Sequence, residues 1–202
     1  MNLWLAPPLV LASKSSVRRA LLEAAGIPLV IEPAAVDERA VESSKAASVS
    51  AARVASLLAR EKALEVAARK SKSTVLGADQ TLALGERRFS KPASTEAARE
   101  QLKTLAGKTH ELHSAVAVAR GGDILFETVA TARLTMRPLS DSFLDAYLAA
   151  ASGGVSSSVG AYQLERVGVH LFERIEGDHF TILGLPLLPL LAYFRSAGLV
   201  AS

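Results

Sequence analysis

Hydrophobic and polar positions in the first part of the chain follow periods that predict a strand and then a helix. The apolar run Leu9–Ala12 predicts a buried strand. Ser15 and Ser16 stand where a helix N-cap is expected, and the apolar stripe that follows them stops at Gly26. The pattern therefore predicts a strand, a loop and a helix in succession.

The same alternation continues through the next part of the chain. A short apolar run, Pro28–Ile31, leads into Pro33–Ser48, a polar stretch without a clear period that predicts a loop. Val49–Arg69 is rich in alanine and free of glycine and proline, so it predicts a long helix with a charged face. Two short strands are expected next, at Thr74–Ala78 and Thr81–Leu84.

The second half of the chain begins with a helix and then turns to longer extended runs. Two of these runs flank Gly121-Gly122-Asp123, which predicts a β-hairpin. In chain order the predicted elements are the helix Ser94–Leu105, the strands His113–Ala119 and Leu125–Met136, the helix Ser140–Ala150, the loop Ser152–Ser158, the strand Val167–Ile175 and the helix Pro186–Phe194.

This order of elements predicts an α/β fold. Strands that alternate with helices and then lie adjacent indicate a mixed, twisted sheet flanked by helices. The sequence has no internal repeat and no Pro/Gly/Ser linker long enough to separate independent domains. Residues 1–202 are therefore expected to form one domain with two lobes.

Composition excludes several classes of protein. With 50% hydrophobic residues in a chain of 202, disorder is excluded. A net charge of +3 argues against a nucleic-acid partner. The absence of cysteine excludes disulfides, thiolate zinc sites and a cysteine nucleophile, and it fits the cytoplasm as the expected location.

Neither of the most apolar stretches predicts a membrane segment. The opening MNLWLAPPLVLAS lacks a positive region before its apolar run, and Pro7-Pro8 would break a signal helix. Ile182–Phe194 is too short to span a bilayer and contains two prolines. The four histidines are scattered and form no HExxH motif, so a catalytic zinc site is not expected.

Two segments carry candidate chemistry on their residues alone. LASKSSVRR (11–19) offers hydroxyls, backbone N–H groups, a helix N-terminus and three cations, which suit an anion; the alternative is a serine cap followed by solvated basic residues. Asp79 follows a buried apolar run, where a carboxylate needs a cationic partner or a metal; the alternative is a turn cap. Glu38, Lys62 and Lys91 alone indicate only solvated surface.

The joint order of several motifs is more specific, and it covers the chain from Leu9 to about Arg195. It resembles the Maf family of nucleotide pyrophosphatases. The matching stretches are LASKSSVRRALLEAAG (11–26), VDE (36–38), AREKA (59–63), LGADQ (76–80), KP (91–92), LKTLAGKTHEL (102–112), VGAYQLE (159–165) and FERIEGDHFTILGLPL (172–187).

The resemblance implies a Maf/Ham1-like fold, with an elongated sheet and a central cleft between two lobes. It also implies a hydrolase of nucleotide metabolism that cuts nucleoside triphosphates into a nucleoside monophosphate and inorganic diphosphate. Mg²⁺ or Mn²⁺ is the implied cofactor. Non-standard nucleotides are its implied targets, and a homodimer is an expectation of the family. The alternative is a nucleotide-binding regulator of septum formation whose hydrolysis is incidental.

The resemblance also assigns roles to individual residues. Asp79 matches the proton acceptor and, together with Glu38, the residues beside the metal. Ser13, Arg18, Lys62 and Lys91 match the residues that hold the triphosphate. The family motif SPRR is altered here, because Ser16 replaces its proline and Val17 its first arginine.

Three positions bear on the nucleotide base. Gln80 and Glu165 match family members that prefer a methylated guanine nucleotide, although Val17 stands where those members have tryptophan. Members that prefer unmodified pyrimidine triphosphates carry Arg at the place of Val17, Thr at the place of Gln80 and Gln at the place of Glu165. A carboxylate at position 165 suits the N1–H and amino groups of guanine, which makes 7-methyl-GTP a candidate substrate. Without the stacking ring, the base preference stays open.

Overall fold

A computed structural model describes residues 3–38, 40, 49–151, 154–156 and 158–201. Parts of the predicted loops Pro33–Ser48 and Ser152–Ser158 lie outside these residues. The chain forms two compact units. The first unit comprises Met1–Gln80, His113–Ala130 and Asp178–Ser202, and the second comprises Thr81–Leu112 and Thr131–Gly177.

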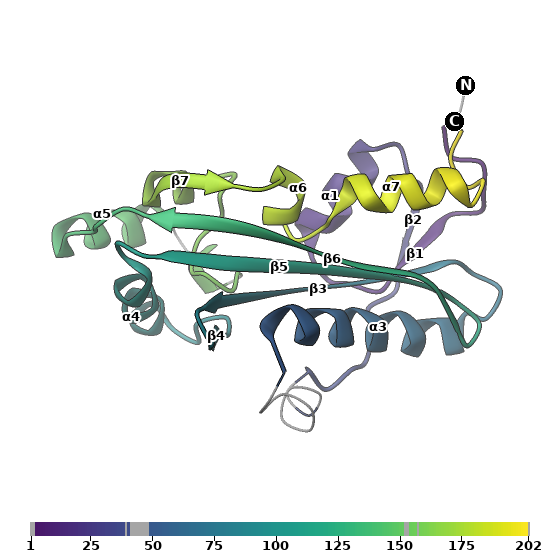
Figure 1. Cartoon of the computed structure of the whole chain (residues 1–202), viewed down its shortest axis with the longest axis horizontal. Coiled ribbons are helices and arrows are strands. Elements are labelled where there is room, and N and C mark those ends of the chain that lie inside the picture. Colours follow the sequence, from purple (N-terminus) through teal and green to yellow (C-terminus); the bar gives the residue numbers. More distant parts are fainter. Residues whose placement is uncertain (1–2, 39, 41–48, 152–153, 157, 202) are drawn as a thin grey trace. The chain divides into compact units, whose positions relative to one another are not determined.

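The strands form a mixed seven-stranded sheet in the order β2-β1-β3-β5-β6-β7, with β4 paired to β3 (Figure 1). β1 is parallel to β2 and β3, whereas β4 is antiparallel to β3 and β7 is antiparallel to β6. The strands are β1 Leu9–Leu11, β2 Leu29–Ile31, β3 Val75–Leu84, β4 Arg87–Phe89, β5 Thr109–Arg120, β6 Asp123–Met136 and β7 Phe172–Glu176. The predicted mixed α/β sheet is confirmed.

Serine side chains cap three of the helices, one of them at Ser15 as the sequence predicts. Ser15, Ser50 and Ser94 each accept a hydrogen bond from the backbone N–H three residues further on. No helix in the described residues is long and apolar enough to cross a bilayer. The helices are α1 Ser16–Ala24, α3 Ala51–Arg69, α4 Thr95–Leu105, α5 Asp141–Ala151, α6 His179–Ile182 and α7 Leu187–Ser196, with short 3₁₀ helices at Gly154–Ser156 and Val167–Leu171.

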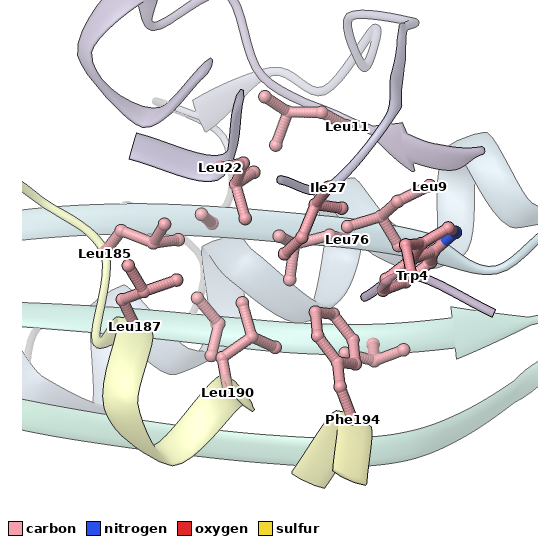
Figure 2. Close-up of a cluster of buried hydrophobic side chains, with 13 residues drawn as sticks. Trp4, Leu9, Leu11, Leu22, Ile27, Leu76, Leu185, Leu187, Leu190 and Phe194 are labelled. Atoms are coloured by element: carbon pink, nitrogen blue, oxygen red, sulfur yellow. The ribbon is translucent and has the colours of Figure 1, made fainter. Parts of the chain in front are cut away.

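The core of the first unit has two layers, because successive strand residues point to opposite faces of the sheet. Leu9, Leu11 and Leu76 pack with Leu22 of α1 and with α7 (Figure 2). The opposite face packs against α3 through small side chains, namely Val10, Ala12, Val75, Ala115, Ala117 and Ala119 of the sheet and Ala55, Ala59, Ala63, Val66 and Ala67 of the helix.

Small residues let α3 approach β3 very closely at Gly77. A Cβ atom added to Gly77 would lie 2.1 Å from the Ala59 carbonyl oxygen and 2.6 Å from the Ala63 nitrogen. Since both atoms belong to the helix backbone, no side-chain rotation can relieve the clash. Only glycine fits at position 77 of this strand.

Two details differ from the predicted elements. The strand expected to close at Ala78 continues without a break to Leu84, and the buried Asp79 within it is paired with Lys62. The strand predicted for Val167–Ile175 begins only at Phe172. Its first part is a 3₁₀ helix in which Gly168 lies against the backbone of Gln163, an approach that favours a tight turn over an extended chain.

Replacing Gly77 with alanine is expected to destabilise the first unit by roughly 1–3 kcal/mol or more, because the added methyl group displaces α3 from β3. Urea unfolding of Gly77→Ala measures the loss. Gly122→Ala is the matched control, since a Cβ there meets nothing within 4 Å. A Gly77→Ala protein as stable as the wild type would show that the close approach is wrong.

Candidate functional site

The site of interest lies at the carboxyl ends of β1 and β3. From β1 the chain passes through α1 to β2, on one side of β1, and it returns through α3 to β3, on the other. Neighbouring parallel strands whose connections leave in opposite directions form a switch point, where ligands bind in open α/β sheets. Ser13 follows β1 at this point, and Asp79 lies on the part of β3 that continues beyond β1.

Asp79, Lys62 and Glu38 form a charged cluster there. The Lys62 Nζ atom lies 2.6 Å from Asp79 Oδ1 and 2.6 Å from Glu38 Oε1, so one ammonium group bridges two carboxylates. The side chains of Asp79 and Lys62 are only 10% and 12% exposed, whereas that of Glu38 is 55% exposed. The cluster therefore has a buried end at Asp79 and an open end at Glu38.

The position of Lys62 follows from the close packing described above. Gly77 and Asp79 are two residues apart on β3 and so share the face that α3 covers. Lys62 precedes Ala63, which lies directly against Gly77. The short distance between helix and strand lets the lysine reach Asp79 without leaving the protein interior.

Burial raises the pKa of the Asp79 carboxyl group, and the positive charges of Lys62 and Arg18 oppose this rise. The negative charge of Glu38 adds to the rise. Asp79 thus depends on neighbouring cations to remain ionised. A buried carboxylate with a raised pKa is a better proton acceptor than an exposed one.

Arg18 joins three segments of the first unit. Its Nε donates to the Gly184 carbonyl at 2.8 Å, and its Nη1 donates to the Ala78 carbonyl at 2.9 Å and to Ser13 Oγ at 3.2 Å. Because β1 ends at Leu11, the Ala78 carbonyl lies beyond the β1 ladder and accepts from Arg18 instead. Burial lowers the pKa of the guanidinium group, and the charges of Asp79 and Glu38 oppose that effect.

Gln80 follows Asp79 on β3, but its side chain makes contacts outside the charged cluster. Its Nε2 donates to Ser114 Oγ at 3.0 Å, to the Ile182 carbonyl at 2.9 Å and to the Thr181 carbonyl at 3.2 Å. Ser114 Oγ in turn donates to the Thr181 carbonyl at 2.7 Å. The amide nitrogen of Gln80 therefore fastens the end of α6 to the sheet, on the face opposite Asp79.

The structure brings together five of the predicted site residues, all in the first unit: Ser13, Arg18, Glu38, Lys62 and Asp79. Lys91 and Glu165 belong to the second unit, where both are exposed. Ser114 and the carbonyls of Thr181 and Gly184 were not predicted as parts of the site. For the turn that contains Thr181 and Gly184, the match of the whole 172–187 stretch to the family is the available sequence signal.

The acidic turn Glu176-Gly177-Asp178 has a structural role. Asp178 caps α6, because its Oδ2 accepts hydrogen bonds from the Thr181 N–H and hydroxyl. Asp178 thereby fixes the start of α6.

A divalent cation fits the cluster at Asp79 as an ion shared with a substrate. In the described part of the chain, no three His, Cys, Asp or Glu side chains converge on one point. Asp79 and Glu38, however, both contact the same ammonium nitrogen, so two carboxylates are close enough to act on one cation. Mg²⁺ is commonly held by one or two carboxylates together with phosphate and water oxygens.

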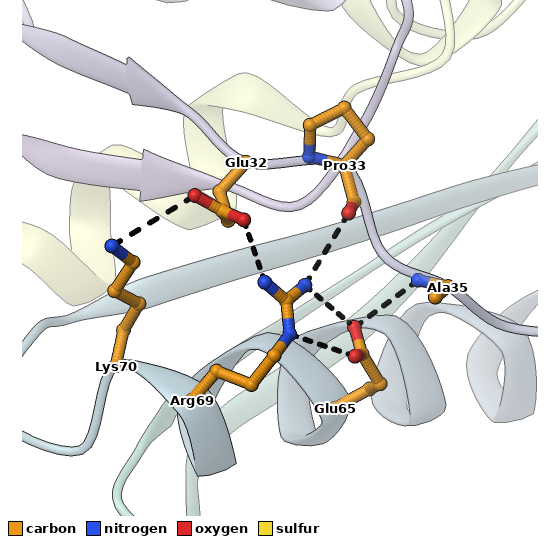
Figure 3. A network of polar contacts seen from close by, with 6 residues as sticks. All are labelled: Glu32, Pro33, Ala35, Glu65, Arg69 and Lys70. Atoms are coloured by element: carbon orange, nitrogen blue, oxygen red, sulfur yellow. Dashed lines mark hydrogen bonds and ion pairs between the residues drawn. The ribbon is translucent and has the colours of Figure 1, made fainter.

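The C-terminal end of α3 carries a second basic residue, Arg69, which is held by acidic side chains. Figure 3 shows Arg69 between Glu32 and Glu65, with Nη1 2.6 Å from Glu32 Oε1 and Nε 2.8 Å from Glu65 Oε1. Its Nη2 also donates to the Pro33 carbonyl. Arg69 fixes the segment after β2 to α3, and its charge is already neutralised by two acids.

The chain is similar to several known proteins over most of its length. A protein-family model described as "Maf-like protein" matches residues 8–197. A nucleoside triphosphate pyrophosphatase of Bradyrhizobium diazoefficiens is 57% identical over 202 residues, with 100% of both chains covered. A 7-methyl-GTP pyrophosphatase of Rhizobium meliloti is 49% identical over 195 residues, which cover 96% of this chain and 98% of that one.

A solved structure of a HAM1 protein from Coxiella burnetii is more distant. Its TM-score is 0.42 at 14% identity, with 65% of this chain and 73% of that chain covered, and no inference rests on it.

Arg18→Lys is expected to lower the free energy of unfolding by about 1–3 kcal/mol, because a lysine ammonium cannot reproduce the fork that joins Gly184, Ala78 and Ser13. Arg19→Lys is the matched control, since Arg19 is exposed and pairs only with Glu23 among the contacts described. Urea unfolding compares the two variants. Equal stability of both would mean that Arg18 does not hold these segments together.

Proposed function

The chain belongs to the Maf family, and we propose that it hydrolyses nucleoside triphosphates between the α and β phosphates. The products are a nucleoside monophosphate and inorganic diphosphate. Two close relatives carry pyrophosphatase names, which supports the reaction. The observation that carries the proposal is the buried Asp79 beside Lys62 and Arg18 at the switch point of the sheet. This arrangement combines a proton acceptor with positive charge.

Asp79 is the proposed proton acceptor. Its raised pKa suits it to take a proton from a water molecule that attacks the α-phosphorus. Lys62 orients the carboxylate through Oδ1, which leaves Oδ2 to face the water. The lysine holds the proton acceptor in place and keeps it ionised.

The cations are proposed to stabilise the charge that develops on the departing diphosphate. Lys62 and Arg18 supply fixed positive charge in a partly buried environment, where it is more effective than in water. Ser13 adds a hydroxyl group at the start of the same turn. Lys91 is proposed as a further phosphate ligand.

Asp79 and Glu38 are the residues proposed to hold Mg²⁺ or Mn²⁺, which when bound polarises the phosphate oxygens. Both carboxylates already surround a cation in the form of the Lys62 ammonium group. Glu38, being half exposed, is free to turn toward a substrate-bound ion while Asp79 stays buried.

7-Methyl-GTP is proposed as a candidate substrate that is cleaved better than the unmodified pyrimidine triphosphates. Glu165 is exposed and offers a carboxylate that suits the N1–H and amino groups of a guanine base. The 49% identical relative named 7-methyl-GTP pyrophosphatase is in line with this preference. A regulator of septum formation with incidental hydrolysis is not favoured, because nucleotide binding alone needs no buried proton acceptor.

Diphosphate release from a panel of triphosphates, measured with Mg²⁺ and with excess chelator, tests the proposal. Asp79→Asn is expected to reduce kcat by at least about 10²-fold, because the amide keeps the shape of the side chain and loses the proton-accepting charge. Asp123→Asn, at an exposed position, is the control. Near wild-type release by Asp79→Asn in a folded protein would refute the proposed role.

Lys62→Ala is expected to reduce kcat strongly, by roughly 10²-fold, because both the positioning of Asp79 and the positive charge are lost. Arg69→Ala removes a cation from the same helix and should change kcat less than about twofold, since Arg69 contacts Glu32, Pro33 and Glu65 at the end of α3 and makes no contact with Asp79 among the contacts described. Steady-state kinetics measures both. Equal losses would show that overall basicity, and not a located phosphate site, supports catalysis.

A further inference from the structure

The segment Ser158–Glu165 of the second unit, here termed the 158–165 loop, is held by buried polar side chains from three separate elements. From α4, Gln101 Nε2 donates to the Val159 carbonyl at 2.7 Å. From α5, the Tyr147 hydroxyl donates to the Ala161 carbonyl at 3.0 Å. From β5, His110 Nε2 shares a 2.7 Å hydrogen bond with the Tyr162 hydroxyl.

The backbone of this loop has a shape that is costly to hold. Ala161 has a φ angle of 59°, a left-handed conformation that side-chain-bearing residues rarely adopt. A Cβ at Gly160 would lie 2.1 Å from the Tyr162 ring, so the ring packs directly on the backbone. The same ring meets Phe172 edge-on at 4.8 Å. Such a conformation persists only where surrounding contacts determine it.

The three holding side chains are themselves expensive to bury. Gln101, His110 and Tyr147 are 7%, 0% and 5% exposed. Burial lowers the pKa of His110 to about 4, so its imidazole is neutral at physiological pH. Its Nδ1 atom has no hydrogen-bond partner among the described residues. Apolar residues would fill this core at a lower desolvation cost, so the polar contacts serve the shape of the loop.

The conformation of the 158–165 loop determines where the backbone of Glu165 lies. Glu165 is exposed and follows Tyr162 by three residues, and the turn that bears it is closed by a hydrogen bond from the Arg166 N–H to the Gln163 carbonyl. The buried contacts therefore fix the origin of an exposed carboxylate. A base-reading group must be held in this way, because its hydrogen bonds discriminate only when their geometry is fixed.

We infer that Gln101, His110 and Tyr147 are positioning residues that set base selectivity, by fixing the 158–165 loop so that Glu165 presents its carboxylate to a guanine-type base. This inference rests on the proposed function of Glu165. The three residues act through the loop and touch no reacting atom. Their loss should change the discrimination between bases and spare the step at the phosphates.

Tyr162→Phe is the most selective test, because it removes the hydroxyl that meets His110 and keeps the ring. The ratio of kcat/KM for 7-methyl-GTP to that for UTP is expected to fall three- to tenfold, mainly through KM for 7-methyl-GTP, while kcat for UTP changes less than twofold. Tyr147→Phe, which frees the Ala161 carbonyl, should act in the same direction. Tyr193→Phe removes a hydroxyl from a ring stacked on Phe126 and is the control.

A double-mutant cycle separates positioning from general stability. Once Glu165→Gln has removed the carboxylate, adding Tyr162→Phe should leave the selectivity ratio unchanged. Hydrogen exchange should show faster exchange at the amides of the 158–165 loop in Tyr162→Phe and Tyr147→Phe, but not in Tyr193→Phe.

The outcomes distinguish this inference from the proposed function. If Glu165→Gln lowers the ratio but Tyr162→Phe and Tyr147→Phe leave it unchanged, the positioning role is wrong and base reading by Glu165 stands. If Glu165→Gln leaves the ratio unchanged, base reading and the inference both fall, while diphosphate release still supports the hydrolase. If the double variant loses further selectivity beyond Glu165→Gln, the tyrosine does not act through Glu165.

Discussion

The close contact between Gly77 and the backbone of α3 determines where the charges of the site lie. A helix packed on a strand through glycine and alanine runs nearer to the sheet than one packed through larger residues. Lys62, beside this contact, therefore reaches Asp79 inside the protein instead of extending into solvent. The burial of the pair follows, and with it the raised pKa of Asp79.

The pair also links the site to the architecture of the sheet. β1 ends where β3 continues, which leaves the Ala78 carbonyl without a partner in β1, next to Asp79. Arg18 fills that position and binds the strand to the turn at Gly184. The structural and electrostatic roles of Arg18 are thus inseparable, because the contacts that bury its guanidinium group are the ones that hold it near Asp79.

Adjacent residues of β3 divide two tasks between them. Asp79 faces α3 and belongs to the charged cluster, whereas Gln80 faces the opposite side and holds the end of α6 through two carbonyls and Ser114. Gln80 matches a base-selective position of the family, and in this chain its amide nitrogen holds the end of α6 against the sheet. The proposed reading of the base by Glu165 depends on the 158–165 loop, which belongs to the second unit.

Much of this could be predicted from the sequence where the signal is local. The cap at Ser15 and the hairpin at Gly121 follow from short-range hydrogen bonding and backbone preference, and the structure has them there. The order of motifs identified the family, which the family model and close relatives confirm.

Long-range contacts could not be predicted in this way. The bridge from Lys62 to Glu38 and Asp79, the carbonyl partners of Arg18 and the hold of Gln101 on Val159 join residues with no shared local pattern. The left-handed Ala161 carries no signal either, because alanine gives no hint of a positive φ. Such features depend on tertiary packing, which a single sequence does not display.

Water is proposed to attack the α-phosphorus, and the fate of the water oxygen shows most directly which phosphorus it attacks. Hydrolysis of a nucleoside triphosphate in ¹⁸O-labelled water, followed by mass spectrometry of the products, locates that oxygen. Attack at the α-phosphorus puts one ¹⁸O atom in the nucleoside monophosphate and none in the inorganic diphosphate. Label in the diphosphate, or release of nucleoside diphosphate and phosphate, would contradict it.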